Sequence, residues 1–211
     1  MNISNKFRNR VITAVLTTII FVMAYIPFLG YIPLGVTRAT IIHVPVIVGA
    51  VLLGPSYGAF LGAMFGLTSL LVNTFSPTIT SFVFSPFYSI NGESGGIWSL
   101  IVCFVPRILI GVISYYVYEG LHRVLKGKGK GKDTIALAAA GAAGALTNTL
   151  LVMNLIYFLF GKEYAGAKGI SIDALYGVIL GIIGVNGIPE AIVAAVLTAA
   201  IAGALKMTKR F

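Results

Sequence analysis

Three ionisable side chains each share a helical turn with a proline inside an apolar run. The pairs are His43 with Pro45, Pro106 with Arg107, and Pro189 with Glu190. Proline donates no backbone hydrogen bond, so the carbonyl four residues earlier loses its usual helical partner. In hydrocarbon a carbonyl without a partner is costly, and another group must satisfy it. A charge beside each freed carbonyl therefore indicates a polar, hydrated cavity within a bundle of helices.

Arg107 and Glu190 each lie near the middle of their apolar runs, so they are expected at similar depth. One interpretation is an ion pair between the two runs, since a partner lowers the ~2.5 to 3.5 kcal/mol that either charge costs at the centre of a membrane. The other is that the planar guanidinium of Arg107 binds an anionic or carbonyl group of a solute. Both hold if the solute competes for the pair.

Amide side chains add hydrogen-bonding capacity at interior positions: Asn148, Asn154 and Asn186. Thr147 and Thr149 add hydroxyls beside the first of them. A single intramembrane Asn commonly links two helices, whereas several that converge on one cavity would bind the hydroxyls and amides of a solute. His43 has the same two interpretations, a satisfied structural histidine or a ligand contact.

Enzyme classes find no support in the sequence. No HExxH, paired-Asp or Gly-x-Ser-x-Gly pattern occurs. The Lys-Gly repeat over 126–132 lacks the Ser or Thr of a phosphate-binding loop, so any use of ATP requires a partner. Cys103 is the only cysteine, which excludes a disulfide framework or a zinc site built within one chain. We expect no catalytic residues, no metal and no cofactor.

The composition that must position these side chains is that of an integral membrane protein. The chain is 58% hydrophobic and 10% charged, with a mean hydropathy of +0.97. Its net charge of +9 comes from basic residues that flank apolar runs, a pattern that favours anionic lipid headgroups over nucleic acid. Most of the basic residues fall in three clusters, over 6–10, 123–132 and 206–210. The positive-inside rule places all three clusters, and therefore both termini, in the cytoplasm.

Six apolar runs separate these clusters, which predicts an all-α bundle of six transmembrane helices in one integral membrane domain over residues 1–211. The spans are expected at approximately 11–28, 39–54, 57–72, 97–118, 134–160 and 174–205. The second and third are short for a core about 30 Å thick, so a re-entrant pair with four or five full spans is the alternative. The sixth is long enough to tilt or bend.

Small residues recur every four positions in two of the runs. Gly58, Gly62 and Gly66 form a stripe in the third, and Ala191, Ala195, Ala199 and Gly203 form one in the sixth. Such smooth faces allow helix backbones to approach closely. They indicate either packing within the chain or a surface that slides against another membrane protein.

Two connections are candidates for covering the mouth of a cavity. The connection over 73–96 is rich in aromatic residues, namely Phe75, Phe82, Phe84, Phe87 and Tyr88. These are typical of a functional loop, or of an aromatic belt at the membrane interface. The connection over 30–38 is the other candidate, with Arg38 at its inner end where an anion would arrive first.

Three segments that include the proline–charge pairs resemble those of the substrate-binding S components of energy-coupling factor (ECF) vitamin transporters. The resemblance rests on residues 32–55, 106–111 and 186–191 and covers essentially the whole chain. It implies a six-helix subunit that captures a vitamin from outside and docks on a membrane scaffold subunit carrying two cytoplasmic ATPases. Of the family's Ala-x-x-x-Ala docking motif in the first helix, this chain keeps only the first alanine, Ala14, and has Thr18 in place of the second.

Residues 147–154, together with the motif of the second run, are most similar to pantothenate-type members. We therefore expect pantothenate to bind with its carboxylate on Arg107 or Arg38. The remaining expected contacts are Asn148, Asn154, Asn186, Glu190, His43 and Tyr88. The alternatives are an S component for pyridoxine or hydroxymethylpyrimidine, or an autonomous secondary transporter in which Glu190 couples to an ion.

Overall fold

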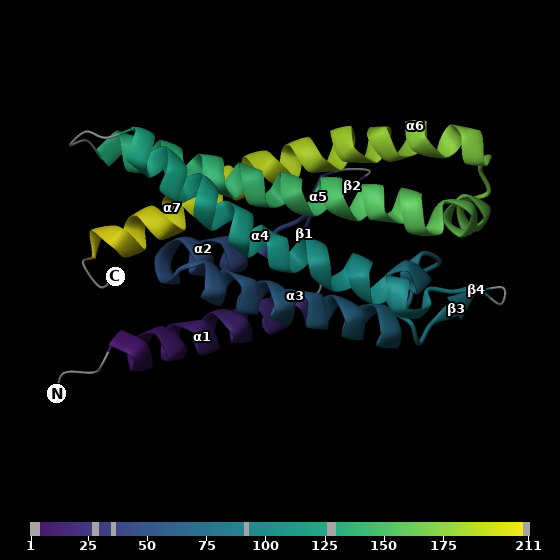
Figure 1. The fold of residues 1–211 in the computed structure, drawn as a ribbon, viewed down its shortest axis with the longest axis horizontal. Helices are drawn as coiled ribbons and strands as arrows, with labels where there is room; N and C mark the ends of the chain where they lie inside the picture. The colour runs from purple at the N-terminus through teal and green to yellow at the C-terminus, as the bar shows by residue number, and fades with distance from the viewer. Residues whose placement is uncertain (1–4, 27–29, 35–36, 91–92, 126–129, 209–211) are drawn as a thin grey trace.

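The computed structural model describes residues 5–26, 30–34, 37–90, 93–125 and 130–208. Most of these residues are helical (Figure 1). The helices are α1 (Asn5–Tyr25), α2 (His43–Leu53), α3 (Pro55–Phe75), α4 (Gly96–Val124), α5 (Lys130–Lys168), α6 (Ile172–Ile182) and α7 (Ile188–Met207), with a 3₁₀ turn η1 (Ser81–Val83) and a π-helical segment η2 (Ile183–Gly187). The predicted helical class is therefore confirmed in outline.

Two short antiparallel hairpins were not predicted. Strands β1 (Tyr31–Leu34) and β2 (Thr37–Thr40) form one, and β3 (Ser89–Ile90) and β4 (Glu93–Ser94) form the other. In the first, Tyr31 pairs with Thr40. Figure 1 shows β1 and β2 near the middle of the molecule's length, and β3 and β4 at one end.

Five helical segments of the described chain are long and apolar enough to cross a membrane. They are Asn5–Tyr25, Pro55–Phe75, Gly96–Val124, Gly131–Lys168 and Ile172–Met207. The last of these contains α6, η2 and α7. These segments support a multi-pass membrane protein.

The apolar run expected over 39–54 is not one continuous helix, which corrects that expectation. Its first residues belong to β2, and α2 has only 11 residues. At 1.5 Å per residue α2 covers about 16 Å, roughly half of a hydrocarbon core. The helix ends at Gly54, whose φ of 107° favours glycine, and Pro55 then begins α3.

The glycine stripe of the third run packs within the chain, as one of its two interpretations predicted. A Cβ atom on Gly62 would clash with the carbonyl oxygen of Arg107 and lie 2.8 Å from Cα of Ile108. Gly58 faces Gly111 of α4 in the same way. Because these positions lack side chains, the backbones of α3 and α4 come into direct contact beside Arg107.

The stripe of the sixth run also faces its own chain. A Cβ atom on Gly141 of α5 would lie 2.8 Å from Cα of Ala195. Ala191 and Ala194 are buried, and α5 and α7 pack along each other. Close helix contacts thus fix the rotation of α4, α5 and α7, the helices that carry the predicted polar residues.

The two ends of the molecule differ. At one end α1 begins, α7 ends and α4 gives way to α5 (Figure 1). We call this the basic end, because the three basic clusters flank these helix termini. The opposite end, which we call the loop end, carries η1, β3 and β4.

Candidate functional site

A polar layer separates two apolar clusters in the middle of the bundle. One cluster contains Ile110, Ala145 and Ala191, and the other contains Val102 and Val152. On α4, on α5 and on the segment formed by α6, η2 and α7, a set of polar residues falls between a member of one cluster and a member of the other. The layer consists of Arg107 on α4, Asn148 and Thr149 on α5, Asn186 in η2 and Glu190 on α7. The fold therefore brings together polar residues that are widely separated in sequence.

Arg107 satisfies the carbonyl that Pro106 frees. Its Nη1 donates a hydrogen bond of 2.8 Å to the oxygen of Val102, the carbonyl four residues before Pro106. Its guanidinium carbon lies 5.6 Å from the ring centroid of Phe65 and 5.2 Å from that of Phe84. With only 7% of its surface exposed, Arg107 is a buried cation held between two aromatic rings.

A cavity of about 90 Å³ adjoins Arg107. Residues from α1, β2, the turn before α2, α3, α4 and α5 line it, namely Ala24, Thr40, Ile42, Phe65, Thr68, Ser69, Val72, Asn73, Arg107 and Asn148. Its walls thus combine one cation, hydroxyl groups and amides with an aromatic ring. This is a donor and acceptor set suited to a small polar anion.

Asn148 and Asn154 have different surroundings. Asn148 lines the cavity, and its buried Oδ1 has no hydrogen-bond partner in the part of the chain that is described. Asn154 does not line it, and its Nδ2 donates a hydrogen bond of 2.7 Å to the carbonyl of Leu150. Six residues rotate a helix by about 600°, so the two amides project from different faces of α5. Of these two amides, only Asn148 offers an acceptor to a molecule in the cavity.

Glu190 is bound by two protein groups from different elements. Its Oε1 accepts a hydrogen bond of 2.8 Å from the backbone N–H of Thr40, and its Oε2 accepts one of 3.1 Å from the hydroxyl of Thr149. Within the described residues no ion pair joins Arg107 to Glu190. The ion pair that was one interpretation of these two charges is therefore not seen among the described residues. Glu190 is instead connected to the cavity through its hydrogen bond with Thr40.

Asn186, although it belongs to the polar layer, does not line the cavity, and neither does His43. His43 begins α2 and is fully buried, and neither ring nitrogen has a hydrogen-bond partner among the described residues. Pro45 falls in the first turn of α2, where proline is tolerated, and the carbonyl of Ile41 accepts a hydrogen bond of 3.0 Å from Val44. Asn186 belongs to η2, which packs against α5 and β2.

The aromatic residues of the connection over 73–96, at the loop end, have different surroundings. Phe84 faces Arg107, whereas Phe82 is buried edge-on against Phe160. Tyr88 packs against the second apolar cluster and does not line the cavity, and Phe87 is 77% exposed. Neither a single lid nor a uniform belt describes this loop. The backbone of Arg38 lies in β2, while its side chain falls outside the described residues.

Hydrogen bonds fix this loop to the end of α3. The hydroxyl of Ser81 donates to Oδ1 of Asn73 over 2.7 Å, and the hydroxyls of Thr74 and Ser85 lie 2.6 Å apart. Asn73 itself lines the cavity. The loop that carries Phe84 is thus connected directly to the cavity wall.

Several lining residues were missed by the sequence reasoning: Thr40, Thr68, Ser69, Asn73 and Phe65. The four on α3 follow a helical spacing that defines one face, and this spacing was the available signal. From the sequence, only the glycines of that helix were assigned a role, and that role was close packing against another helix. Thr40 had no such signal, because its place depends on a hairpin that the apolar pattern did not predict.

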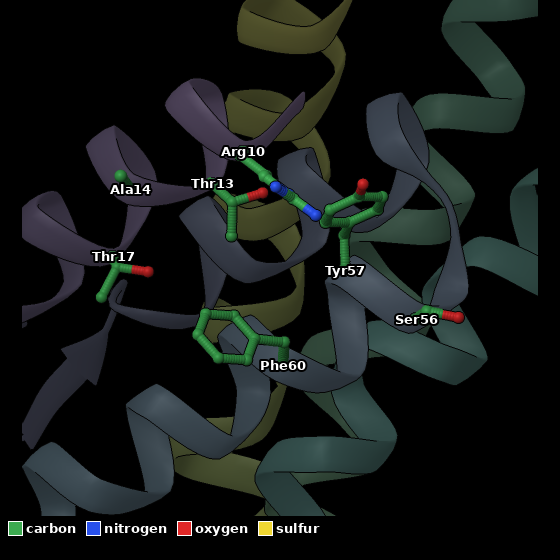
Figure 2. Close-up of a pocket in the computed structure, with 7 residues that line it drawn as sticks. All are labelled: Arg10, Thr13, Ala14, Thr17, Ser56, Tyr57 and Phe60. Atoms are coloured by element: carbon green, nitrogen blue, oxygen red, sulfur yellow. The ribbon is translucent and has the colours of Figure 1, made fainter. Parts of the chain in front are cut away.

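A larger groove of about 610 Å³ lies between α1 and α3 (Figure 2). Arg10, Thr13, Ala14, Thr17, Ser56, Tyr57 and Phe60 line it. The groove shares no lining residue with the cavity beside Arg107 and lies near the start of α1. It is therefore a second surface feature, separate from the polar layer.

The chain is similar to known membrane transport proteins. Residues 8–202 match the model of the family "ECF transporter, substrate-specific component". The "Pantothenic acid transporter PanT" of Lactococcus lactis subsp. cremoris (strain MG1363) is 37% identical over 169 residues, which cover 80% of this chain and 78% of the relative. The "Pantothenate transporter PanT" of Leuconostoc mesenteroides subsp. mesenteroides is 35% identical over 208 residues, which cover 96% of this chain and 94% of the relative.

Proposed function

Because the chain belongs to the family of substrate-specific components of ECF transporters, we propose that it captures pantothenate outside the cell for an ATP-driven importer. The family and the relatives make it a multi-pass membrane protein of vitamin uptake rather than an enzyme. The names of two relatives support pantothenate as the vitamin. The remaining support comes from the chemistry of the cavity.

The observation that carries the proposal is the buried guanidinium of Arg107 at a cavity lined with hydroxyls and amides. Pantothenate has a carboxylate, an amide and two hydroxyls. Arg107 supplies a cation for the carboxylate, and Oδ1 of Asn148 supplies an acceptor for a hydroxyl or the amide N–H. Thr68, Ser69 and Asn73 offer further donors and acceptors on α3.

The cavity is smaller than its proposed ligand requires. Pockets for drug-sized molecules measure about 300 Å³ or more, against about 90 Å³ here. Binding must therefore widen the cavity. Of the elements in its wall, the hairpin of β1 and β2 is the shortest, and we propose that it moves when the vitamin enters.

ATP-dependent release requires partners, which we propose are the scaffold subunit and two cytoplasmic ATPases of an ECF complex. The chain itself contains no nucleotide-binding motif. The groove between α1 and α3 contains Ala14, the residue retained from the family's docking motif, and we propose this groove as the scaffold contact (Figure 2).

Two alternatives concern the solute and the energy source. A related vitamin such as pyridoxine or hydroxymethylpyrimidine could take the place of pantothenate. An autonomous secondary transporter would use the buried carboxylate of Glu190, 7% exposed, to couple transport to an ion.

Calorimetry on the purified chain, followed by uptake into liposomes, tests the proposal. We expect pantothenate to bind, pyridoxine and hydroxymethylpyrimidine to fail to displace it, and the chain alone to accumulate no pantothenate under a proton gradient. Accumulation by the isolated chain would favour the secondary transporter. Tight binding of one of the other vitamins, with none of pantothenate, would overturn the substrate assignment.

A further inference from the structure

Glu190 lies where three separate elements meet. It is in the first turn of α7, directly after the π-helical segment η2. One carboxylate oxygen accepts the N–H of Thr40 in β2, and the other accepts the hydroxyl of Thr149 in α5. The side chain therefore fastens the hairpin to two helices at once.

Thr40 is the residue through which the hairpin reaches the cavity. It ends β2, pairs with Tyr31 across the hairpin, and lines the cavity beside Arg107. Immediately after it, the N–H of Ile41 donates a hydrogen bond of 3.0 Å to the carbonyl of Gly30. The backbone at Thr40 thus forms both the base of the hairpin and part of the cavity wall.

We infer that Glu190 is a positioning residue, which holds the hairpin of β1 and β2 against α5 and α7 and so sets the shape of the cavity without touching the solute. The inference rests on the proposed function and deepens it. Glu190 is not among the residues that line the cavity, whereas its partner Thr40 is. Its effect on binding is therefore indirect and passes through the backbone of the hairpin.

The chemistry of the contact explains why a carboxylate suits this position. Two donors, an N–H from a strand and an O–H from a helix, approach one side chain, and a carboxylate offers an acceptor oxygen to each. Glutamine keeps one acceptor for Thr40, and its NH₂ can donate to the hydroxyl oxygen of Thr149. Methionine has a similar length but no comparable acceptor, so it leaves the N–H of Thr40 unsatisfied.

Two matched variants, Glu190→Met and Glu190→Gln, separate positioning from direct contact. Hydrogen–deuterium exchange of peptides over residues 30–41 reports on the hairpin, and pantothenate dissociation reports on the site. In Glu190→Met we expect hairpin exchange and the dissociation rate each to rise about tenfold or more, because a buried donor loses its acceptor. In Glu190→Gln we expect both to stay within about threefold of the wild type. Glu163→Met, at a carboxylate far along α5 from Thr149, controls for the substitution itself and should change neither readout.

The outcomes distinguish this inference from the proposed function. Hairpin exchange that is unchanged in Glu190→Met, or a glutamine variant that fails as badly as the methionine variant in both readouts, overturns positioning. If the wild type binds no pantothenate, the proposed function fails, but hairpin exchange in the free protein still decides the role of Glu190. Should Glu190→Met not fold, Glu190→Gln decides alone. For Glu190→Gln, a pantothenate affinity and a hairpin exchange rate near those of the wild type support positioning. A tenfold loss of affinity with hairpin exchange unchanged from the wild type contradicts it.

Discussion

Arg107 satisfies a backbone carbonyl that lacks a helical donor, and the same guanidinium lines the cavity as a potential binding group. Pro106 leaves the carbonyl of Val102 without a helical donor, and Nη1 of Arg107 supplies one. Phe65 and Phe84 face the guanidinium, and such contacts contribute about 0.5 to 2 kcal/mol each in partly desolvated sites. These contacts offset the cost of burying the cation. They also hold it at the cavity, ready for an anionic group.

Replacing Arg107 by Ala should weaken pantothenate binding by at least ~2 kcal/mol, because a desolvated charge pair loses one partner. Arg107→Lys should recover only part of this loss, since an ammonium cannot reproduce the planar fork of the guanidinium. Calorimetry measures both. Arg123→Ala is the matched control on the same helix, because Arg123 is exposed and pairs with Glu119 over 2.8 Å. Unchanged affinity in a folded Arg107→Ala protein would rule out the contact with the carboxylate.

At the level of the elements, α2 and the hairpin before it occupy successive parts of the molecule's length. The short α2 occupies only the half of the molecule toward the basic end, and β1 and β2 lie near mid-length (Figure 1). Irregular backbone is tolerated at membrane depth where protein or a cavity surrounds it. The hairpin meets this condition through its contacts with η2 and α7. Its last residue, Thr40, forms part of the cavity wall.

Another element that departs from regular α-helix is η2. Pro189 cannot donate to the carbonyl of Val185, and the π-helical segment Ile183–Gly187 ends two residues before this proline. Both η2 and α7 pack against β2, and Glu190 of α7 accepts the N–H of Thr40 in that strand. A proline in α7 therefore helps to place the anchor of the hairpin.

The direct contact of α3 with α4 gives a prediction at the level of these elements. Gly62→Val should destabilise the protein by about 1 to 3 kcal/mol, because the new side chain meets the backbone of Arg107 and Ile108. It should also weaken pantothenate binding, since α4 carries Arg107. Thermal unfolding in detergent and calorimetry measure the two effects.

Gly120→Val is the control for this substitution. Nothing lies within 4 Å of a Cβ atom at Gly120, and valine is a better helix former than glycine. We expect no loss of stability there. Equal unfolding temperatures for Gly62→Val and Gly120→Val would show that α3 and α4 can move apart to accommodate the added side chain without loss of stability.

For the molecule as a whole, the fold places the helix termini that adjoin the three basic clusters at one end. Side chains tie this end together, since the hydroxyl of Tyr118 donates to Oδ1 of Asp133 over 2.6 Å and Nζ of Lys206 lies 3.5 Å from the same oxygen. The contacts join α4, α5 and α7. Under the positive-inside rule we propose that the basic end is cytoplasmic. We also propose that the chain crosses the membrane six times, with α2 and the hairpin before it together forming the crossing that α2 is too short to make alone.

Cysteine labelling in intact cells tests this orientation. The native Cys103 is buried and gives little background. A cysteine at Phe87, which is 77% exposed at the loop end, should react with a membrane-impermeant maleimide. A cysteine at Val124, which is 80% exposed at the basic end, should react only after the cells are opened. The reverse pattern would invert the proposed topology.

The sequence by itself determined the long apolar helical segments, the basic clusters and the pairing of prolines with charges, because these depend on neighbours along the chain. It did not determine the strand at the start of the run over 39–54. The close packing of Gly58 and Gly62 was predicted as one of two options, and the freed carbonyl of Val102 was expected to need a donor. The roles of Asn148 and Asn154 could not be separated, since both are amides in one apolar run.

Only the tertiary structure decided which polar groups share a cavity. That choice depends on how each helix is rotated about its axis and on where backbone meets backbone, as α3 meets α4 at Gly62. It likewise placed Thr40 on the cavity wall and gave its N–H to Glu190, across 150 residues of sequence. Contacts of this range arise from packing, and no local pattern of residues encodes them.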